Sequence, residues 1–176
     1  MSENIQLIKV SMDYQDSFMD GLKECEKESS EQAWIYVHEK DLALPKESFS
    51  SYIETLLDYE FTAPEFFVRG ITYWAIMGNE VVGRLGLRLE LNEELEKLGG
   101  HIGYIVRPSF RGQGIASKML ALALETDYAK DIGKLLLTCD LNNEASERTI
   151  LKNGGVFYDI VELESRANKK RFWIKL

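Results

Sequence analysis

Hydrophobic and polar positions in the first third of the chain follow two different periods. Residues 5–10 (IQLIKV) form a short apolar run that is typical of a strand. Between residues 12 and 27, large apolar side chains recur one helical turn apart, which predicts a helix; they are Tyr14, Phe18 and Leu22. A second helix is predicted to begin at Pro45, because proline is favoured in a first helical turn and an apolar stripe follows, made of Phe49, Ile53, Leu56 and Leu57.

The middle of the chain is rich in β-forming residues. Residues 71–91 predict a hairpin that is broken at Gly78 and Asn79. A third run, residues 101–108, ends at Pro108, and a helical pattern follows over residues 114–133.

The last third predicts a buried strand, a short helix and two further strands. Residues 134–141 are almost wholly apolar, as in a strand that is buried on both faces. Residues 143–155 predict a helix with a glycine stop, and residues 156–165 and 171–176 predict a closing strand pair with Trp173 in the core. The order β-α-α-β-β-β-α-β-α-β-β therefore predicts an α/β fold with a mixed sheet covered by helices, in a single domain of residues 1–176.

Composition and charge exclude several classes of protein. The chain has 176 residues and a net charge of -8, which disfavours nonspecific binding to nucleic acid or to an anionic membrane. No apolar run approaches the roughly 20 residues that span a bilayer. The first ten residues lack the pattern of a signal peptide, and two cysteines, Cys25 and Cys139, make no disulfide framework or metal motif. We therefore expect a cytoplasmic protein without metal, and a monomer or homodimer.

A glycine pair separates the third β-rich run from the helix that follows. In the stretch RPSFRGQGIASKML, Gly112 and Gly114 stand directly before the predicted helix, and Arg111 precedes them. The first amides of a helix have no intrahelical partner, and together with the helix dipole they attract an anion. The pair alone is equally compatible with a tight loop, since it matches neither the dinucleotide fingerprint nor the P-loop.

Residues 111–116 (RGQGIA) resemble the R/Q-x-x-G-x-G/A motif with which the GCN5-related N-acetyltransferases bind the pyrophosphate of acetyl-CoA. The preceding YIVRPSF resembles the family's strand that pairs with the pantetheine arm, and CDLNNEASERTILKNGGVF resembles its second conserved segment. The resemblance covers nearly the whole chain and implies a mixed, mostly antiparallel central sheet. It also implies that acetyl-CoA is the acyl donor and that its binding residues are Ile105, Val106, Arg111, Gly112, Gln113, Gly114, Ile115, Ala116, Asn143 and Ser146.

The same resemblance implies direct transfer of an acetyl group from acetyl-CoA to a primary amine. A backbone N–H on the strand before Pro108 is expected to stabilise the oxyanion. The family often uses a tyrosine seven residues after the asparagine as general acid, and this position is Ile150 here. Tyr104 is the candidate substitute, with a tyrosine in the core or the pocket wall as the other interpretation. Ile150 also favours an alternative function, a non-catalytic acyl-CoA-binding module; a fold-only partner-binding domain is the third possibility.

The general base is the least determined residue. His101 has a suitable ordinary pKa and lies on the same strand as Tyr104, but strand alternation places the two side chains on opposite faces unless a bulge intervenes. A structural histidine is the competing interpretation. Arg88 and Glu90 are expected either to meet an acceptor or to be solvated charges at a strand end.

The acceptor itself is open. The acidic composition favours a cationic acceptor such as a polyamine, an aminoglycoside or a basic peptide, and other small amines remain candidates. Trp34, Tyr36 and His38 alternate as in an extended segment, which either lines an acceptor groove or packs in the core. Residues 65–70 (EFFVRG) predict either a lid over the substrate or a loop anchored by Phe66 and Phe67.

Overall fold

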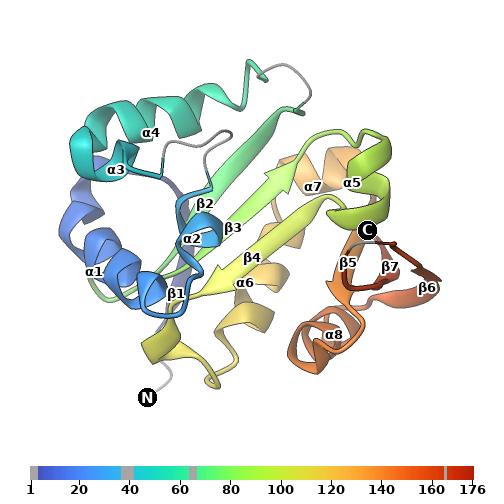
Figure 1. Cartoon of the computed structure of the whole chain (residues 1–176). Helices are drawn as coiled ribbons and strands as arrows, with labels where there is room; N and C mark the ends of the chain where they lie inside the picture. Colours follow the sequence, from blue (N-terminus) through green and yellow to red (C-terminus); the bar gives the residue numbers. More distant parts are fainter. Residues whose placement is uncertain (1–3, 37–41, 64–66, 165) are drawn as a thin grey trace.

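The computed structural model describes residues 4–36, 42–63, 67–164 and 166–176 and follows the predicted order of strands and helices (Figure 1). The strands are β1 (Ile5–Lys9), β2 (Gly70–Met77), β3 (Glu80–Arg88), β4 (Ile102–Val106), β5 (Lys134–Asp140), β6 (Val156–Val161) and β7 (Lys169–Lys175). In these residues, no helix is long and apolar enough to cross a membrane.

The helices cover the predicted amphipathic stretches with additional breaks, and two short helices, over residues 31–35 and 93–98, lie outside those stretches. They are α1 (Gln15–Glu26), α2 (Glu31–Ile35), α3 (Leu44–Glu47), α4 (Phe49–Asp58), α5 (Glu93–Leu98), α6 (Ile115–Leu124), α7 (Asp127–Ile132) and α8 (Glu144–Lys152). The single helix expected over residues 114–133 is divided because Thr126 caps a new helix, its hydroxyl accepting the N–H of Ala129.

The strands form two hydrogen-bonded sheets rather than one. The first has the order β1-β2-β3-β4 and the second the order β5-β7-β6, and every strand pair in them is antiparallel. The hairpin turn between β2 and β3 falls at Gly78 and Asn79, as predicted. The α/β class with mostly antiparallel strands is thus confirmed, and the sheet is divided between β4 and β5 (Figure 1).

The four-stranded sheet is buried on both faces by separate clusters of side chains. On the face of α1, α2 and α4, the aromatic ring of Phe18 stacks on the rings of both Trp34 and Trp74. On the face of α6, Leu85 packs with Met119 and other aliphatic residues. Strand β4 is one of the two edge strands of this sheet, and its ends lie near α6 and α5 (Figure 1).

Two aromatic predictions from the sequence are wrong. Trp34 lies on helix α2 and not in an extended segment, and it is fully buried with its indole N–H donating to the carbonyl of Phe18. Trp173 is only half-buried and lies against Lys134 and Tyr158, because the alternation of β7 sends Phe172 and Ile174 into the core instead. The predictions for His38 and Phe66 lie outside the described residues.

Candidate active site

Strands β4 and β5 meet at one point and then separate. Gly100 and Leu137 form an isolated bridge. The N–H of His101 donates to the carbonyl of Leu136 at 2.7 Å, and the N–H of Leu136 donates to Nδ1 of His101 at 2.9 Å. Beyond this junction, β4 and β5 belong to different sheets. The two strands therefore diverge from a junction at His101, and we call the V-shaped opening between β4 and β5 the fork.

The backbone of β4 presents unpaired donors to this fork. The N–H of Arg88 donates to the His101 carbonyl and the N–H of Arg107 donates to the Val82 carbonyl, so every second residue of β4 pairs with β3. In an antiparallel pair the intervening residues point their N–H and C=O groups the other way. The N–H groups of Tyr104 and Val106 consequently face the open edge of β4.

The glycine loop and helix α6 close one end of this edge. Gly112 and Gly114 have φ angles of 78° and 77°, a backbone conformation that glycine adopts without strain. A Cβ built on either residue meets no atom within 4 Å, so the space above both glycines is open. Gly114 caps α6 without a side chain, and the first amides of the helix have no intrahelical partner. The arrangement is that of an anion cradle.

A cavity of about 500 Å³ joins the β4 edge, the glycine loop and helix α8; we call it the α6 cavity. Nine of the ten coenzyme-binding residues that the sequence indicated line it together with Tyr104, whereas Gln113 and His101 do not. The indicated lining residues are Ile105, Val106, Arg111, Gly112, Gly114, Ile115, Ala116 and Asn143, and Ser146 completes the set at the start of α8. Gln113 lies within the loop but outside the cavity lining.

Arg111 is held by two contacts within the protein. Its Nη1 donates to a carboxylate oxygen of Glu28 at 2.7 Å, and its Nε donates to the Val106 carbonyl at 3.1 Å. Both side chains of this ion pair are 44% exposed. An anion at the glycine loop would therefore share Arg111 with Glu28.

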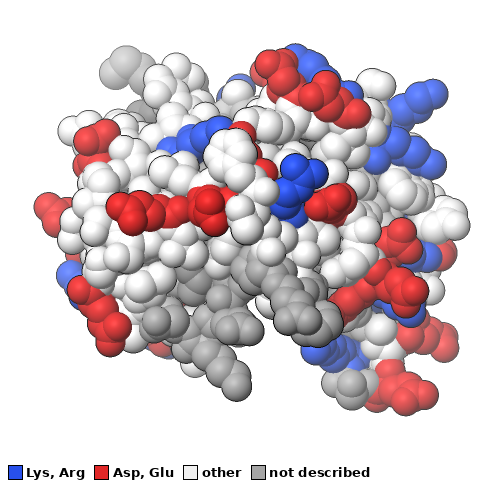
Figure 2. Space-filling model, turned by 90° about the horizontal axis from the view of Figure 1, so that it is seen from above, with Lys and Arg blue, Asp and Glu red and all other residues white. Residues whose placement is uncertain are grey.

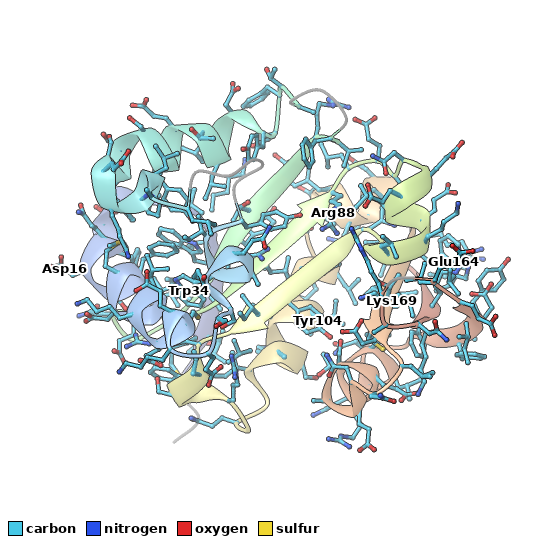
Figure 3. The ribbon with its side chains drawn as sticks, viewed as in Figure 1. Asp16, Trp34, Arg88, Tyr104, Glu164 and Lys169 are labelled. Atoms are coloured by element: carbon cyan, nitrogen blue, oxygen red, sulfur yellow. The ribbon has the colours of Figure 1, made fainter. Side chains whose placement is uncertain are left out.

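Asn143 and Ser146 organise the N-terminus of α8. Asn143 is the N-cap, and its side-chain oxygen accepts the N–H of Ser146 at 3.0 Å. The Ser146 hydroxyl lies 2.9 Å from the Tyr104 hydroxyl, which joins β4 to α8 across the fork. Figure 3 shows the Tyr104 side chain in the gap between these two elements. Burial raises the pKa of Tyr104, so its hydroxyl is protonated at neutral pH.

Ile150 does not face the α6 cavity. It is 1% exposed and packs in the core against Gly155. The hydroxyl that reaches the cavity from a tyrosine comes instead from Tyr104 on β4, two residues before the end of that strand. The position at which the resemblance implied a tyrosine is thus a packing position in this chain.

The geometry of His101 is that of a structural residue. The side chain is 8% exposed, its Nδ1 accepts the N–H of Leu136, and burial lowers its pKa. A neutral ring that accepts at Nδ1 carries its proton on Nε2. His101 therefore fastens the apex of the fork, and no contact joins it to the α6 cavity.

A second cavity of about 330 Å³ lies beside the residues that precede β4; we call it the β3 cavity. Its walls come from segments that are far apart in the sequence: α2, the end of α4, β2, the end of β3, α5 and the β6–β7 connection. Arg88 lines it, as does Tyr36, whose φ of 57° is unusual for a residue other than glycine. Phe67 also lines this cavity, and Glu90 pairs with Arg69 outside its lining.

Several cavity residues have no counterpart in the sequence expectations. Phe110 and Ser117 flank the glycine loop. One face of α8 supplies further residues of the α6 cavity, namely Ala145, Arg148, Thr149 and Lys152. Their spacing of three and four residues is the available sequence signal, because such residues share one face of a helix.

Comparison with known proteins agrees with this geometry. Residues 16–154 match the model of the acetyltransferase (GNAT) family. The chain belongs to the GNAT family. It is accordingly an acetyltransferase in class, with acetyl-CoA as the acyl donor of the family. No curated protein matches the chain by sequence.

Solved GNAT structures share the fold at low identity. The ribosomal L7/L12 α-N-protein acetyltransferase RimL, in complex with coenzyme A, superposes with a TM-score of 0.70 at 18% identity, covering 99% of this chain and 96% of that one. RimJ from Mycobacterium smegmatis, in complex with a CoA disulfide, superposes with a TM-score of 0.70 at 18% identity, covering 97% of this chain and 81% of RimJ. The microcin C7 self-immunity acetyltransferase MccE, in complex with acetyl-CoA and AMP, superposes with a TM-score of 0.68 at 13% identity, covering 99% of this chain and 94% of MccE.

The α6 cavity fits the GNAT acyl donor. The unpartnered amides of α6 and the open space above Gly112 and Gly114 match a pyrophosphate. The free edge of β4 matches an amide-containing arm, which can pair with strand backbone. Arg111, Arg148 and Lys152 also line the cavity, and such cationic side chains suit a ligand that carries further phosphate.

Proposed function

We propose that this chain transfers the acetyl group of acetyl-CoA directly to a primary amine. The observation that carries the proposal is the open edge of β4, which ends against the unpartnered N-terminus of α6. Acetyl-CoA supplies an acetyl group activated as a thioester. The chain's task is to hold this group, to stabilise charge on its oxygen and to admit an amine.

Backbone groups are the oxyanion donors in this proposal. The N–H groups of Tyr104 and Val106 face the fork and are fixed by the pairing of β4 with β3. Fixed N–H donors stabilise an oxygen whose negative charge grows during the reaction, and losing one such donor typically costs about 100-fold or more in rate. Because the donors are backbone groups, side-chain substitution does not remove them.

The Tyr104 hydroxyl is the proposed proton donor for the leaving thiolate. As the new C–N bond forms and the C–S bond breaks, the sulfur gains negative charge while the amine loses a proton to water. The hydroxyl lies on the α6 cavity, is protonated, and is oriented by Ser146. A thiol has an ordinary pKa near 8.5, so the thiolate leaves without obligatory help near neutral pH. Tyr104 is therefore expected to assist the step modestly.

Solved structures with this fold support an amine acceptor without identifying it. RimL acts on the α-amino group of a ribosomal protein, and MccE is an immunity acetyltransferase, but both resemble this chain in fold alone. We propose a single domain over residues 1–176 that acts as a monomer or homodimer and uses neither nucleic acid nor membrane. The buried free thiols of Cys25 and Cys139 support a cytoplasmic location.

A thiol-release assay tests the proposal. Acetyl-CoA and a panel of amino acids, polyamines, aminoglycosides and peptides are incubated with the protein, and free coenzyme A and acetylated product are measured together. Amine-dependent thiol release with matching product is the expected result. Saturable acetyl-CoA binding without turnover across the panel would indicate a non-catalytic acyl-CoA-binding module. Absence of acetyl-CoA binding would leave a fold-only partner-binding domain.

A further inference from the structure

Among the described residues, two arginines on one face of β3 lack the carboxylate partner that the other arginines have. Six of the eight arginines form ion pairs within this part of the chain. Within the described residues, no carboxylate lies within ion-pair distance of Arg84 or Arg88. In a chain with a net charge of -8, two unpaired guanidinium groups side by side require a physical explanation.

Arg84 is buried with part of its hydrogen-bonding capacity unused. It is 3% exposed, its Nε donates to the Ala33 carbonyl at 2.9 Å, and its Nη1 has no partner in the part of the chain that the structure describes. Burial lowers its pKa to about 10, so the group is still charged at neutral pH. Uncompensated buried charge is costly, and a nearby anion would offset part of that cost.

Arg88 extends this positive charge into the β3 cavity. The Arg84 guanidinium carbon lies 3.8 Å from the centre of the Tyr36 ring and the Arg88 guanidinium carbon lies 5.7 Å from it, so both arginines converge on one ring. Nη1 of Arg88 donates to the Gly100 carbonyl at 2.9 Å, which fixes the guanidinium. Its Nε and Nη2 atoms have no protein partner among the described residues.

Two glycines make room for this arrangement and place it next to the fork. Gly86 and Gly103 are directly paired across β3 and β4. A Cβ on Gly86 would lie 2.8 Å from the Tyr36 ring, and a Cβ on Gly103 would lie 3.7 Å from Nη2 of Arg88. The guanidinium thus stands over the residue before Tyr104, whose N–H faces the fork. Figure 3 shows Arg88 near the start of β4 and Tyr104 further along it.

The local charge of the β3 cavity differs in sign from that of the whole protein. The lining contains Arg88, Arg166 and a single described carboxylate, Glu94, which lies 3.8 Å from Arg166. Acidic and basic side chains both occur on the face seen from above (Figure 2). The remaining walls are largely apolar, from Tyr59, Phe67 and neighbouring aliphatic residues.

We propose that the β3 cavity is the acceptor pocket and that the acceptor is an amino acid with an apolar side chain. Arg88 binds the carboxylate of this acceptor. A volume of about 330 Å³ and apolar walls suit a small molecule with an apolar side chain. A guanidinium binds a carboxylate through charge-assisted hydrogen bonds. This inference rests on the proposed function and names its substrate class, in place of the cationic acceptor that the overall charge favours.

The same charge helps the amine to react. An amine must be neutral to attack a thioester, and a positive group nearby disfavours the ammonium form. With its carboxylate on Arg88, the acceptor would hold its amine a few bonds away, in the direction of the β4 edge. Arg84 and Arg88 then favour loss of the ammonium proton to water, so that no carboxylate base is required.

The test compares acceptors that differ only in the carboxylate. Acetylation of phenylalanine and leucine is measured against phenethylamine and isoamylamine, with wild type, Arg88→Met and Arg88→Lys. The expected result is that wild type prefers each amino acid by about 30-fold in kcat/KM, since hydrogen bonds to charged groups contribute effects of that order. Arg88→Met should remove the preference by slowing the amino acids alone, and Arg88→Lys should restore it in part.

The matched control is Arg69→Gln, which removes the same charge from a partly exposed ion pair with Glu90 outside the cavity lining; it should keep the wild-type preference. Acetyl-CoA affinity is measured for every variant and should be unchanged within about twofold. If Arg88→Met fails to fold, the wild-type comparison of the paired acceptors decides alone.

The failures of the two proposals are distinguishable. Equal rates for amino acids and decarboxylated amines, or faster rates for polyamines or peptides, would overturn the carboxylate inference and leave acetyl transfer intact. If no amine is acetylated, the proposed function fails; calorimetry with phenylalanine and N-acetylphenylalanine then tests the pocket itself. Arg88-dependent binding would support the carboxylate site, and no binding at about 10 mM, a concentration at which even weak sites fill, would overturn it.

Discussion

The two cavities beside β4 are built from different parts of the polypeptide. The α6 cavity presents backbone groups: the amides of α6, the glycine loop and the N–H groups of Tyr104 and Val106. The β3 cavity presents side chains, chiefly Arg88 and the Tyr36 ring. A site made of backbone groups requires a particular local conformation, so the residues that permit this conformation form a short motif in the sequence. A side-chain site can change with single substitutions, which suits the part of an enzyme that selects its acceptor.

The largest expected effect comes from changing the backbone of the α6 cavity. Gly114→Val places a branched side chain at a φ of 77° and in the open space above the loop, so acetyl-CoA affinity should fall by about 100-fold or more. Gly78→Val is the matched control, because Gly78 has a φ of 61° and equally open surroundings in the β2–β3 turn.

Both glycine variants should lose a similar stability, on the order of 1–2 kcal/mol for a non-glycine residue in the left-handed region. Titration calorimetry and thermal unfolding measure the two quantities. Gly78→Val should bind acetyl-CoA like wild type. If the affinity that Gly114→Val loses is fully explained by its lost stability, so that the folded fraction of the variant binds acetyl-CoA normally, the loop is only a tight turn and does not bind the anion.

A smaller effect is expected at the side chain that joins the two halves of the fork. Tyr104→Phe removes the hydroxyl that contacts Ser146. We expect kcat to fall by less than roughly 100-fold, which is the smallest rate effect typical of a positioned general acid. Melting temperature should change little, since the ring remains. A loss of more than 100-fold at unchanged melting temperature would show that Tyr104 is an essential proton donor and that the thiolate does not leave unaided.

A substitution in the wall of the β3 cavity should change the KM for the acceptor without changing the KM for acetyl-CoA. Gly86→Ala brings a methyl group to 2.8 Å from the Tyr36 ring and so displaces the ring on which Arg84 and Arg88 converge. We expect KM for the acceptor to rise about fivefold, because a displaced wall weakens positioning. KM for acetyl-CoA should not change. A shift of both values would mean that the two cavities are not separate binding sites.

The smallest effect on activity is expected at His101, although stability should change. His101→Gln removes the ring that accepts the Leu136 N–H, which costs about 1–3 kcal/mol of unfolding free energy at pH 8. Burial lowers the pKa of His101, so the unfolded chain binds a proton first as the pH falls below 6.5 and wild type loses stability there.

The stability difference between wild type and His101→Gln should therefore shrink as the pH falls from 7.5 to 5.5. Urea unfolding at several pH values measures it. A constant difference would show that the ring is not buried in its neutral form. A hundredfold loss of turnover at unchanged stability would instead make His101 the general base.

The sequence was most informative where local backbone conformation carries the function. Gly112 and Gly114 before a helix, Pro108 after a strand and Asn143 at a helix start are local signals, and the structure places them around one cavity. The division of the sheet was not predictable, because it depends on the single junction of His101 with Leu136, 35 residues apart. Alternation did separate His101 from Tyr104 correctly, and no bulge brings them together.

The β3 cavity could be predicted only in fragments. The sequence indicates Arg88 and Tyr36 as candidates for acceptor contacts. Their convergence requires α2 to pack over β3, whereas the alternation of residues 34–38 predicts an extended segment in place of that helix. The absence of a carboxylate beside Arg84 and Arg88 is a property of the folded arrangement of the described residues. Overall charge is a poor guide to a cavity that a few side chains line.

Titration of acetyl-CoA into the wild-type protein tests the central claim most directly, because the claim is that the β4 edge and the α6 N-terminus form the acyl-donor site. The account predicts one saturable site per chain and a stabilisation of about 2.7 kcal/mol at 100 times the dissociation constant. Coenzyme A should compete for the same site. An absence of binding heat and of thermal stabilisation at about 1 mM acetyl-CoA, where a site of even modest affinity fills, would contradict it.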